Sequence, residues 1–174
     1  MTHQAIVVGS KNAEVGIEQA MAILRAGGSP LDAVVAGIRE VERNPEEHYV
    51  GYSSVPNLLG EVELDASVME GHRLAAGAVG ALRGHRDAVE LARRVMERLP
   101  HVLIVGDGAG RLAGEVGLPP VDPSRPRPTR CGRSCWREGK ARSWALRSCG
   151  RCGPSRRRWP PAPTVLTRAT APST

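Results

Sequence analysis

The sequence predicts a layered α/β fold over residues 1–120, with a sheet inside and helices outside, followed by a basic segment that does not continue it. The first observation is that short apolar runs alternate with longer stretches at helical spacing up to residue 117. The second is an abrupt change of composition. Residues 121–174 hold 13 of the 24 Lys and Arg residues and two acids, a net charge of +11, whereas residues 1–120 carry −5. All four Cys, all three Trp and eight of the 14 Pro also lie in the later segment.

The first three predicted elements are a strand and two helices. Residues 5–8 form a short apolar strand, and residues 14–25 have helical spacing that Gly27-Gly28 ends as a left-handed cap. Ser29-Pro30-Leu31-Asp32 starts the second helix, because Ser caps, Pro fits the first helical position and an Asp there suits the helix dipole. Asn44-Pro45 ends this helix. Its expected buried face is formed by Val34, Ile38 and Val41.

The remaining predicted elements alternate strand and helix. Residues 61–68 alternate with period two, so that one face should enter the core: Val62, Leu64, Ala66 and Val68. Residues 74–82 are small and apolar, which predicts a strand packed on both faces. Residues 87–98 return to helical spacing, residues 102–105 read as a buried strand, and residues 106–108 read as a tight turn before a short helix over 109–116.

Several blocks in register resemble one enzyme family. They are Gly9–Ile17, Gly27–Val34, the distinctive run Val50–Gly71, and Pro100–Ala109. Together they look like the α-subunit half of the glycosylasparaginase and isoaspartyl peptidase/L-asparaginase family. The resemblance covers residues 5–117 in the correct order.

The resemblance implies a partial αββα sandwich of the N-terminal-nucleophile hydrolase type. Such precursors cut themselves before a Thr, whose hydroxyl then attacks an amide while its own α-amine, with a pKa near 8, acts as the base. The implied substrate is a small-molecule amide, namely asparagine, an isoaspartyl peptide or glycosylasparagine. The implied assembly is a homodimer of αβ units, with no cofactor. The mildly acidic, ordinary composition of residues 1–120 separately favours a cytoplasmic protein.

The motif that carries the nucleophile is absent from these 174 residues. The nearest candidate, Pro163-Thr164-Val165-Leu166, has Pro before the Thr and Leu where the family has Gly. The family's Arg-Val-Gly-Asp substrate clamp is absent too, so no catalytic residue is assigned and we expect this chain to be inactive and to lack its β-subunit half. Lys11 stands where the glycosylasparaginase branch often has a substrate-contacting Trp, which favours plain asparagine or isoaspartyl substrates.

Three residues of the distinctive run are candidates for a place near the active site or for a structural role. Asp65 lies on the polar side of its strand, Asn57 follows Pro in a turn where its side chain can bond the backbone, and Gly51 belongs to the Val-Gly-Tyr step. Glu61 and Glu63 share a strand face, and we expect them to be solvated carboxylates rather than an acid–base pair.

Four interpretations of residues 121–174 remain open. The favoured one is a shifted reading frame in a GC-rich gene. The second is a zinc module formed by Cys131, Cys135, Cys149 and Cys152. The third is a nucleic-acid-binding arm around Arg156-Arg157-Arg158-Trp159, and the fourth is a disulfide framework. The longest apolar runs are far shorter than the ~20 residues that a membrane-spanning helix needs, so an integral membrane protein is not expected.

Overall fold

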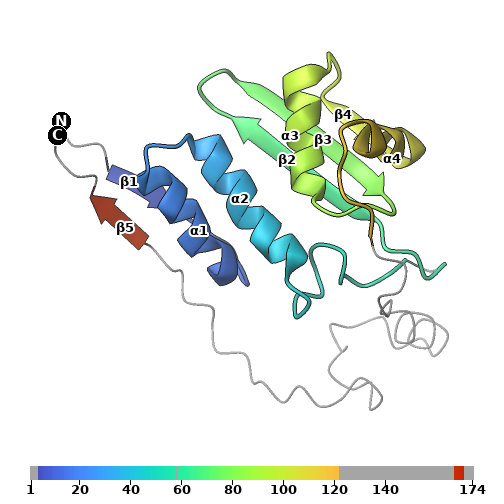
Figure 1. Ribbon diagram of the computed structural model, residues 1–174, viewed down its shortest axis with the longest axis horizontal. Coiled ribbons are helices and arrows are strands. Elements are labelled where there is room, and N and C mark those ends of the chain that lie inside the picture. Colours follow the sequence, from blue (N-terminus) through green and yellow to red (C-terminus); the bar gives the residue numbers. More distant parts are fainter. Residues whose placement is uncertain (1–3, 58, 122–166, 171–174) are drawn as a thin grey trace, which may run out of the picture.

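The computed structural model describes residues 4–57, 59–121 and 167–170. The elements follow the order β1 (Gln4–Val7), α1 (Glu14–Arg25), α2 (Pro30–Arg43), β2 (Leu64–Glu70), β3 (Ala75–Leu82), α3 (Ala88–Arg98), β4 (Leu103–Val105), α4 (Gly106–Glu115) and β5 (Thr167–Thr170). Figure 1 shows α1 and α2 side by side, next to a three-stranded sheet that carries α3 and α4. This arrangement confirms an α/β fold.

The ends of the first two helices follow local sequence signals. The N–H of Gly28 bonds the carbonyl of Ile23 at 2.9 Å, while Gly27 adopts a φ of +82°, so α1 ends in a Schellman motif. The Ser29 hydroxyl accepts a hydrogen bond of 3.0 Å from the N–H of Asp32 at the start of α2. Both predicted caps are confirmed.

Helices α1 and α2 approach closely through glycine. A methyl group added at Gly16 would overlap the backbone of Gly37, so only the absence of a side chain allows this spacing. The predicted buried face of α2 was wrong at Val34, which is 48% exposed, whereas Val35 is 2% exposed. The reason is that α2 has two covered sides, one against α1 through Gly37 and one in the main core through Val35.

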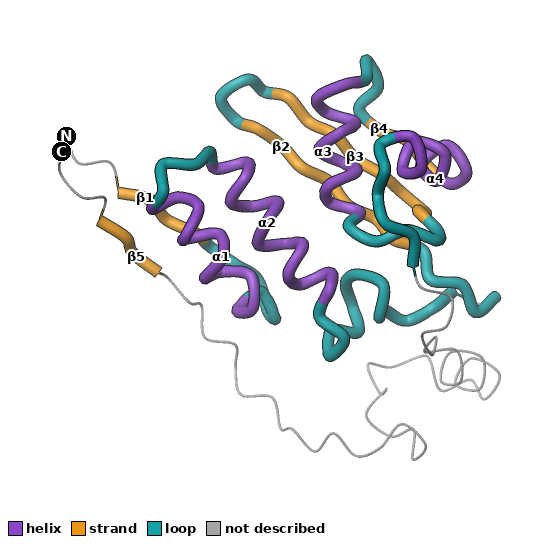
Figure 2. Tube along the Cα trace, in the orientation of Figure 1, coloured by secondary structure: helices purple, strands orange, loops and turns teal. Residues whose placement is uncertain are grey.

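The main sheet has the strand order β2-β3-β4, with β3 antiparallel to β2 and parallel to β4. Helix α3 lies across β2 and β3, and α4 packs on β3 (Figure 2). Between the sheet, these helices and α2 lies the hydrophobic core, which contains Val35, Leu64, Val68, Val79, Leu82, Ala88, Val89, Leu91, Ala92, Val95, Ala109 and Ala113. Leu64 and Val68 enter it as predicted, and Val62 and Ala66 pack against it.

The opposite face of this sheet is open in the described part of the chain. Met69 of β2 is 67% exposed, and Leu103 and Val105 of β4 are each 56% exposed. Two predictions are therefore corrected: β3 is covered on one face rather than two, and residues 102–105 are not buried, because only Ile104 turns toward the core. The predicted turn over 106–108 is also corrected, since α4 begins at Gly106 directly after β4.

A second, two-stranded sheet joins the two ends of the chain. β1 pairs antiparallel with β5, with Gln4 opposite Thr170 and Val7 opposite Thr167. Four residues of the segment after 120 therefore form a strand, which the sequence analysis did not anticipate; Thr is β-branched and suits an extended backbone. Among the helices of the described residues, none combines the length and the apolar character needed to cross a bilayer.

Candidate functional site

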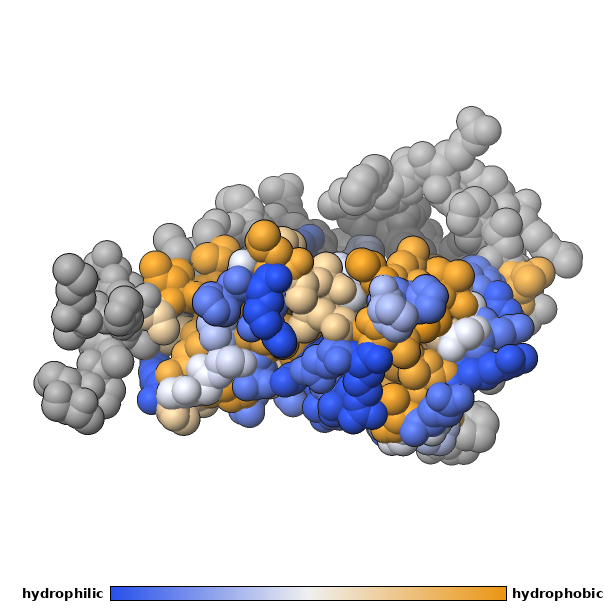
Figure 3. Space-filling model, turned by 90° about the horizontal axis from the view of Figure 1, so that it is seen from above, coloured by the Kyte–Doolittle hydropathy of each residue, from blue (hydrophilic) through white to orange (hydrophobic). Residues whose placement is uncertain are grey.

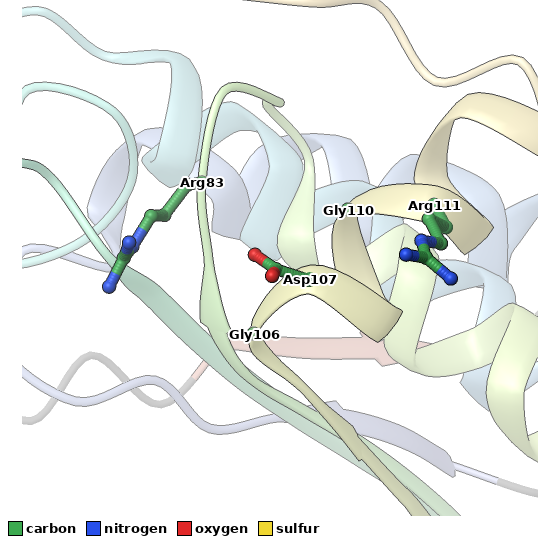
Figure 4. Close-up of a pocket in the computed structure, with 5 residues that line it drawn as sticks. All are labelled: Arg83, Gly106, Asp107, Gly110 and Arg111. Carbon is green, nitrogen blue, oxygen red and sulfur yellow. The ribbon is translucent and has the colours of Figure 1, made fainter.

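A cavity on the surface of the described residues lies where β3 and β4 end. It measures about 290 Å³ and is lined by Arg83, Gly106, Asp107, Gly110 and Arg111. Figure 4 shows the carboxylate of Asp107, at the start of α4, between the side chains of Arg83 and Arg111. The carboxyl ends of neighbouring parallel strands are a common place for a binding site in α/β folds. The lining residues include no Ser, Thr or Cys, so they provide no hydroxyl or thiol nucleophile.

Of the two arginines at this cavity, Arg83 is already paired with carboxylates. Arg83 contacts the carboxylates of Glu61 and Glu63, the former at 3.3 Å. Hydrogen bonds from Asn57 and Arg83 hold the pKa of Glu63 below its usual range, and the same Glu63 raises the pKa of Arg83. Glu61 and Glu63, in the segment before β2, therefore both pair with the guanidinium of Arg83. They do not face each other as an acid and a base.

Asp65 lies on the open face of β2 and is exposed. Its Oδ1 accepts a hydrogen bond of 2.8 Å from the N–H of Ala81. The register between β2 and β3 shifts at this point, so that two residues of β3 stand opposite Asp65. The carboxylate therefore satisfies a backbone donor that the bulge leaves without a ladder partner.

Asn57 organises the turn before β2. Its Oδ1 accepts hydrogen bonds from the N–H groups of Leu59 and Glu61, at 2.9 and 3.0 Å. Its own N–H donates to the carbonyl of Glu61 at 2.8 Å. These contacts favour the structural role that the sequence analysis left open, since the amide oxygen is used within the turn.

Gly51 is buried against the end of α2 with a φ of +77°. A Cβ at this position would overlap the backbone of Glu42. Both the backbone conformation and the space require glycine here. Among the described residues no hydrogen bond joins Gly51, Asn57 or Asp65 to one another, and each residue bonds or packs within its own turn or strand pair.

A group of buried carboxylates that the sequence pattern did not predict lies between α2 and α3. Asp87, Glu42 and Glu90 are 1%, 4% and 7% exposed. Burial alone would raise the pKa of Asp87, but the hydrogen bonds and charge of Arg43, together with the charge of Arg39, hold it below its usual value. In the sequence, this group could have been inferred only from Arg39 and Arg43, which lie one helical turn apart on α2 and can pair with carboxylates on the same side.

The candidate metal ligands Cys131, Cys135, Cys149 and Cys152 lie outside the described residues, as does the Arg156–Trp159 run. Within the part that the structure describes, no three His, Cys, Asp or Glu side chains are grouped as metal ligands.

Comparison with known proteins matches residues 1–149 to a family model described as asparaginase. The chain belongs to the asparaginase family. The match continues for 29 residues beyond the change of composition at Pro120.

Individual members of the family are similar to part of the chain. The isoaspartyl peptidase/L-asparaginase of Mus musculus is 48% identical over 99 residues, which cover 57% of this chain and 30% of that protein. The Homo sapiens protein of the same name is 44% identical over 99 residues, 57% and 32% of the two chains. A plant-type L-asparaginase of Pyrococcus furiosus is 39% identical over 125 residues, 67% and 39%. The chain thus spans about a third of the length of these family members.

Proposed function

We propose that this chain is the scaffold half of an amidohydrolase that acts on L-asparagine or isoaspartyl peptides. The observation that carries the proposal is the match of residues 1–149 to the asparaginase family, whose similar members are named for these two activities. The fold is compatible with it, because a three-stranded sheet covered by helices on one side provides one half of a sandwich.

In this proposal the open face of the sheet receives the half of the sandwich that this chain lacks. The central strand presents small residues there, including Ala76, Ala78 and Gly80. Apolar side chains of β2 and β4 stand on either side, among them Met69 and Val105. Hydrophobic side chains reach the surface at several places in the described part of the molecule (Figure 3). Covering such apolar area contributes about 25 cal/mol per Å², so the uncovered face favours association.

The nucleophile belongs to that partner half. These 174 residues contain no Thr-Val-Gly block, and the cavity beside α4 is lined by Arg, Asp and Gly alone. Amide hydrolysis by a Thr needs its hydroxyl, its α-amine as base and donors for the tetrahedral oxyanion. The chain alone is accordingly inactive in this proposal.

Two assays test the inactivity: aspartate release from an isoaspartyl dipeptide, which should not exceed that of a boiled control, and ammonia release from L-asparagine. The purified 174-residue chain should release no more ammonia than a boiled control, and release above that control would overturn the proposal.

The DNA after codon 120 gives an independent test. A Thr-Val-Gly block in another open reading frame would support both the proposed hydrolase function and a shifted frame after codon 120. If related strains encode residues 121–174 in the same intact frame, the frame shift is contradicted.

Co-expression tests the partner. The chain is produced with the part of the mouse protein that the match does not cover, and it should retain that part on an affinity column. Val105→Asp, on the open face, should abolish retention, whereas Val15→Asp, at a 50% exposed position of α1, should not. Equal retention by both variants would show that the open face is not the docking surface.

A further inference from the structure

The junction between α2 and the start of α3 contains a carboxylate without a charged partner of its own. Glu42, in the last turn of α2, is 4% exposed. Its Oε1 accepts a hydrogen bond of 3.1 Å from the N–H of Val89, in the first turn of α3. Val89 lies 47 residues further along the chain, so this bond ties the α1–α2 pair to the unit formed by the sheet and α3.

The guanidinium groups near Glu42 are engaged elsewhere. Arg43 binds both oxygens of Asp87, at 2.8 and 2.6 Å, and Arg39 contacts Asp87 at 3.4 Å and Glu90 at 3.9 Å. The Oε2 of Glu42 has no hydrogen-bond partner among the described residues. A buried carboxylate oxygen in this position is costly when the group is ionised and much less costly when it carries a proton.

The charged groups around Glu42 can be named for each element that packs against it. On α2 itself they are Arg39 and Arg43, and at the start of α3 the charged group is Asp87; Glu90 of α3 contacts Arg39. From the loop after α2 the contact is the backbone of Gly51, which carries no charge. Burial is the main cause that raises the pKa of Glu42 to about 7; the negative charge of Asp87 adds to it, while the Val89 hydrogen bond and the two guanidinium groups oppose it.

We propose that Glu42 is a proton-dependent latch, which in its protonated form holds α2 on the first turn of α3 and in its ionised form releases that turn. The Val89 N–H at the start of α3 can bond to Glu42 whether the carboxyl is protonated or ionised. Ionised Glu42, however, puts a second negative charge beside the buried Asp87, and protonated Glu42 does not. The proposal concerns the fold of this half and holds whatever substrate the family member uses.

The pH range follows from the two protonation states. The folded-state pKa of Glu42, about 7, lies above the ordinary value of 4.5, so the folded chain binds the proton more tightly than the unfolded one. The contribution to stability is complete below pH 4.5 and is lost as the pH rises through 7. Asp87 acts in the opposite sense, because its pKa lies below the ordinary 3.8 and its pairing with Arg43 is lost as the pH falls through that lowered pKa. The junction is therefore firmest at mildly acidic pH.

Two measurements on the purified chain test the latch. Carbon-detected NMR gives the titration midpoint of the Glu42 carboxyl in the unaltered protein, which should lie above 6; a midpoint below 6 overturns the proposal. Amide exchange gives the protection of the Val89 N–H, corrected for intrinsic exchange. It should fall about tenfold between pH 6 and pH 8, because each pH unit above the midpoint lowers the closed population about tenfold.

Two variants separate the latch from general loosening. Glu42→Gln removes the titration, so the pH dependence of Val89 protection should disappear, and Glu40→Gln, at an exposed position of the same helix, should keep it. If Glu42 titrates above 6 but Val89 protection stays constant, the carboxyl holds no latch. The same conclusion follows if Glu42→Gln folds and shows an unaltered pH dependence.

Discussion

The carboxylate of Asp65 and the backbone N–H of Ala81 meet across the irregularity between β2 and β3, at 2.8 Å. Ala81 has a φ of +50°, in the left-handed region that residues with a Cβ rarely adopt. The side chain of one strand thus stabilises a strained residue of its neighbour. The bulge lies one residue from Leu82, the last residue of β3 and a fully buried part of the core.

Asp65→Ala should lower the free energy of unfolding by about 1 kcal/mol, because the N–H of Ala81 loses its acceptor at a site that water can reach. Asp65→Asn should be close to neutral, since an amide oxygen accepts the same hydrogen bond. Urea denaturation followed by far-UV circular dichroism measures both. Equal losses in the two variants would show that the charge of Asp65, and not its hydrogen bond to Ala81, is what matters.

Ala81→Gly should stabilise the chain by about 0.5–1 kcal/mol, because glycine adopts a positive φ without the steric penalty of a Cβ. The matched control is Ala78→Gly, in the same strand at ordinary β geometry, which should destabilise by a similar amount. The same urea titration compares them. A loss of stability in Ala81→Gly equal to that of the control would mean that the bulge is not strained.

The parts of this fold that the sequence predicts well are those that neighbouring residues determine. Ser29 caps α2 through Asp32, three residues away, and Gly27-Gly28 ends α1 through hydrogen bonds that reach back only to Ile23. Period-two alternation likewise identified the inward side of β2, Leu64 and Val68 included. Interactions between residues this close in the chain can be predicted from a single sequence.

The parts that escaped prediction depend on contacts between distant segments. Periodicity marked an apolar stripe on α2 but could not show that Gly37 meets Gly16 of another helix, which turns Val34 outward. In the same way, nothing local to Asp65 indicates that β3 will place Ala81 opposite it with a register shift. The buried carboxylates were missed for this reason also, since Glu42 and Asp87 become neighbours only when α2 meets α3.

Gly51→Ala should destabilise the chain by about 3 kcal/mol or prevent folding, because the new methyl group would overlap the backbone of Glu42 at a positive φ. Gly27→Ala is the matched control. Gly27 has nearly the same φ, +82°, but nothing lies within 4 Å of its Cβ position, so only the conformational cost of about 1–2 kcal/mol applies. Thermal unfolding gives both values. If the two substitutions lower the free energy of unfolding equally, Gly51 does not lie in tight contact with the backbone of Glu42.

Arg43→Gln should lower the free energy of unfolding by about 1–3 kcal/mol at pH 7, because it leaves the side chain of Asp87, which is fully buried, with only the weaker contact to Arg39. The loss is smaller than for a fully buried pair, since the Arg43 side chain is 41% exposed and water partly screens it.

The pH dependence of this loss identifies its cause. Arg43 lowers the pKa of Asp87, so the pairing stabilises the chain above the ordinary value of 3.8 and is lost as the pH falls through the folded-state pKa. Without Arg43, burial raises that pKa, and Asp87 takes up a proton in milder acid. The difference in stability between the variant and the unaltered chain should therefore shrink as the pH is lowered from 7 toward 4. Urea denaturation at several pH values measures it, with Arg25→Gln, an exposed residue of α1, as the control. A difference that stays constant across this range would mean that Arg43 acts through packing of its aliphatic stem, since packing does not titrate.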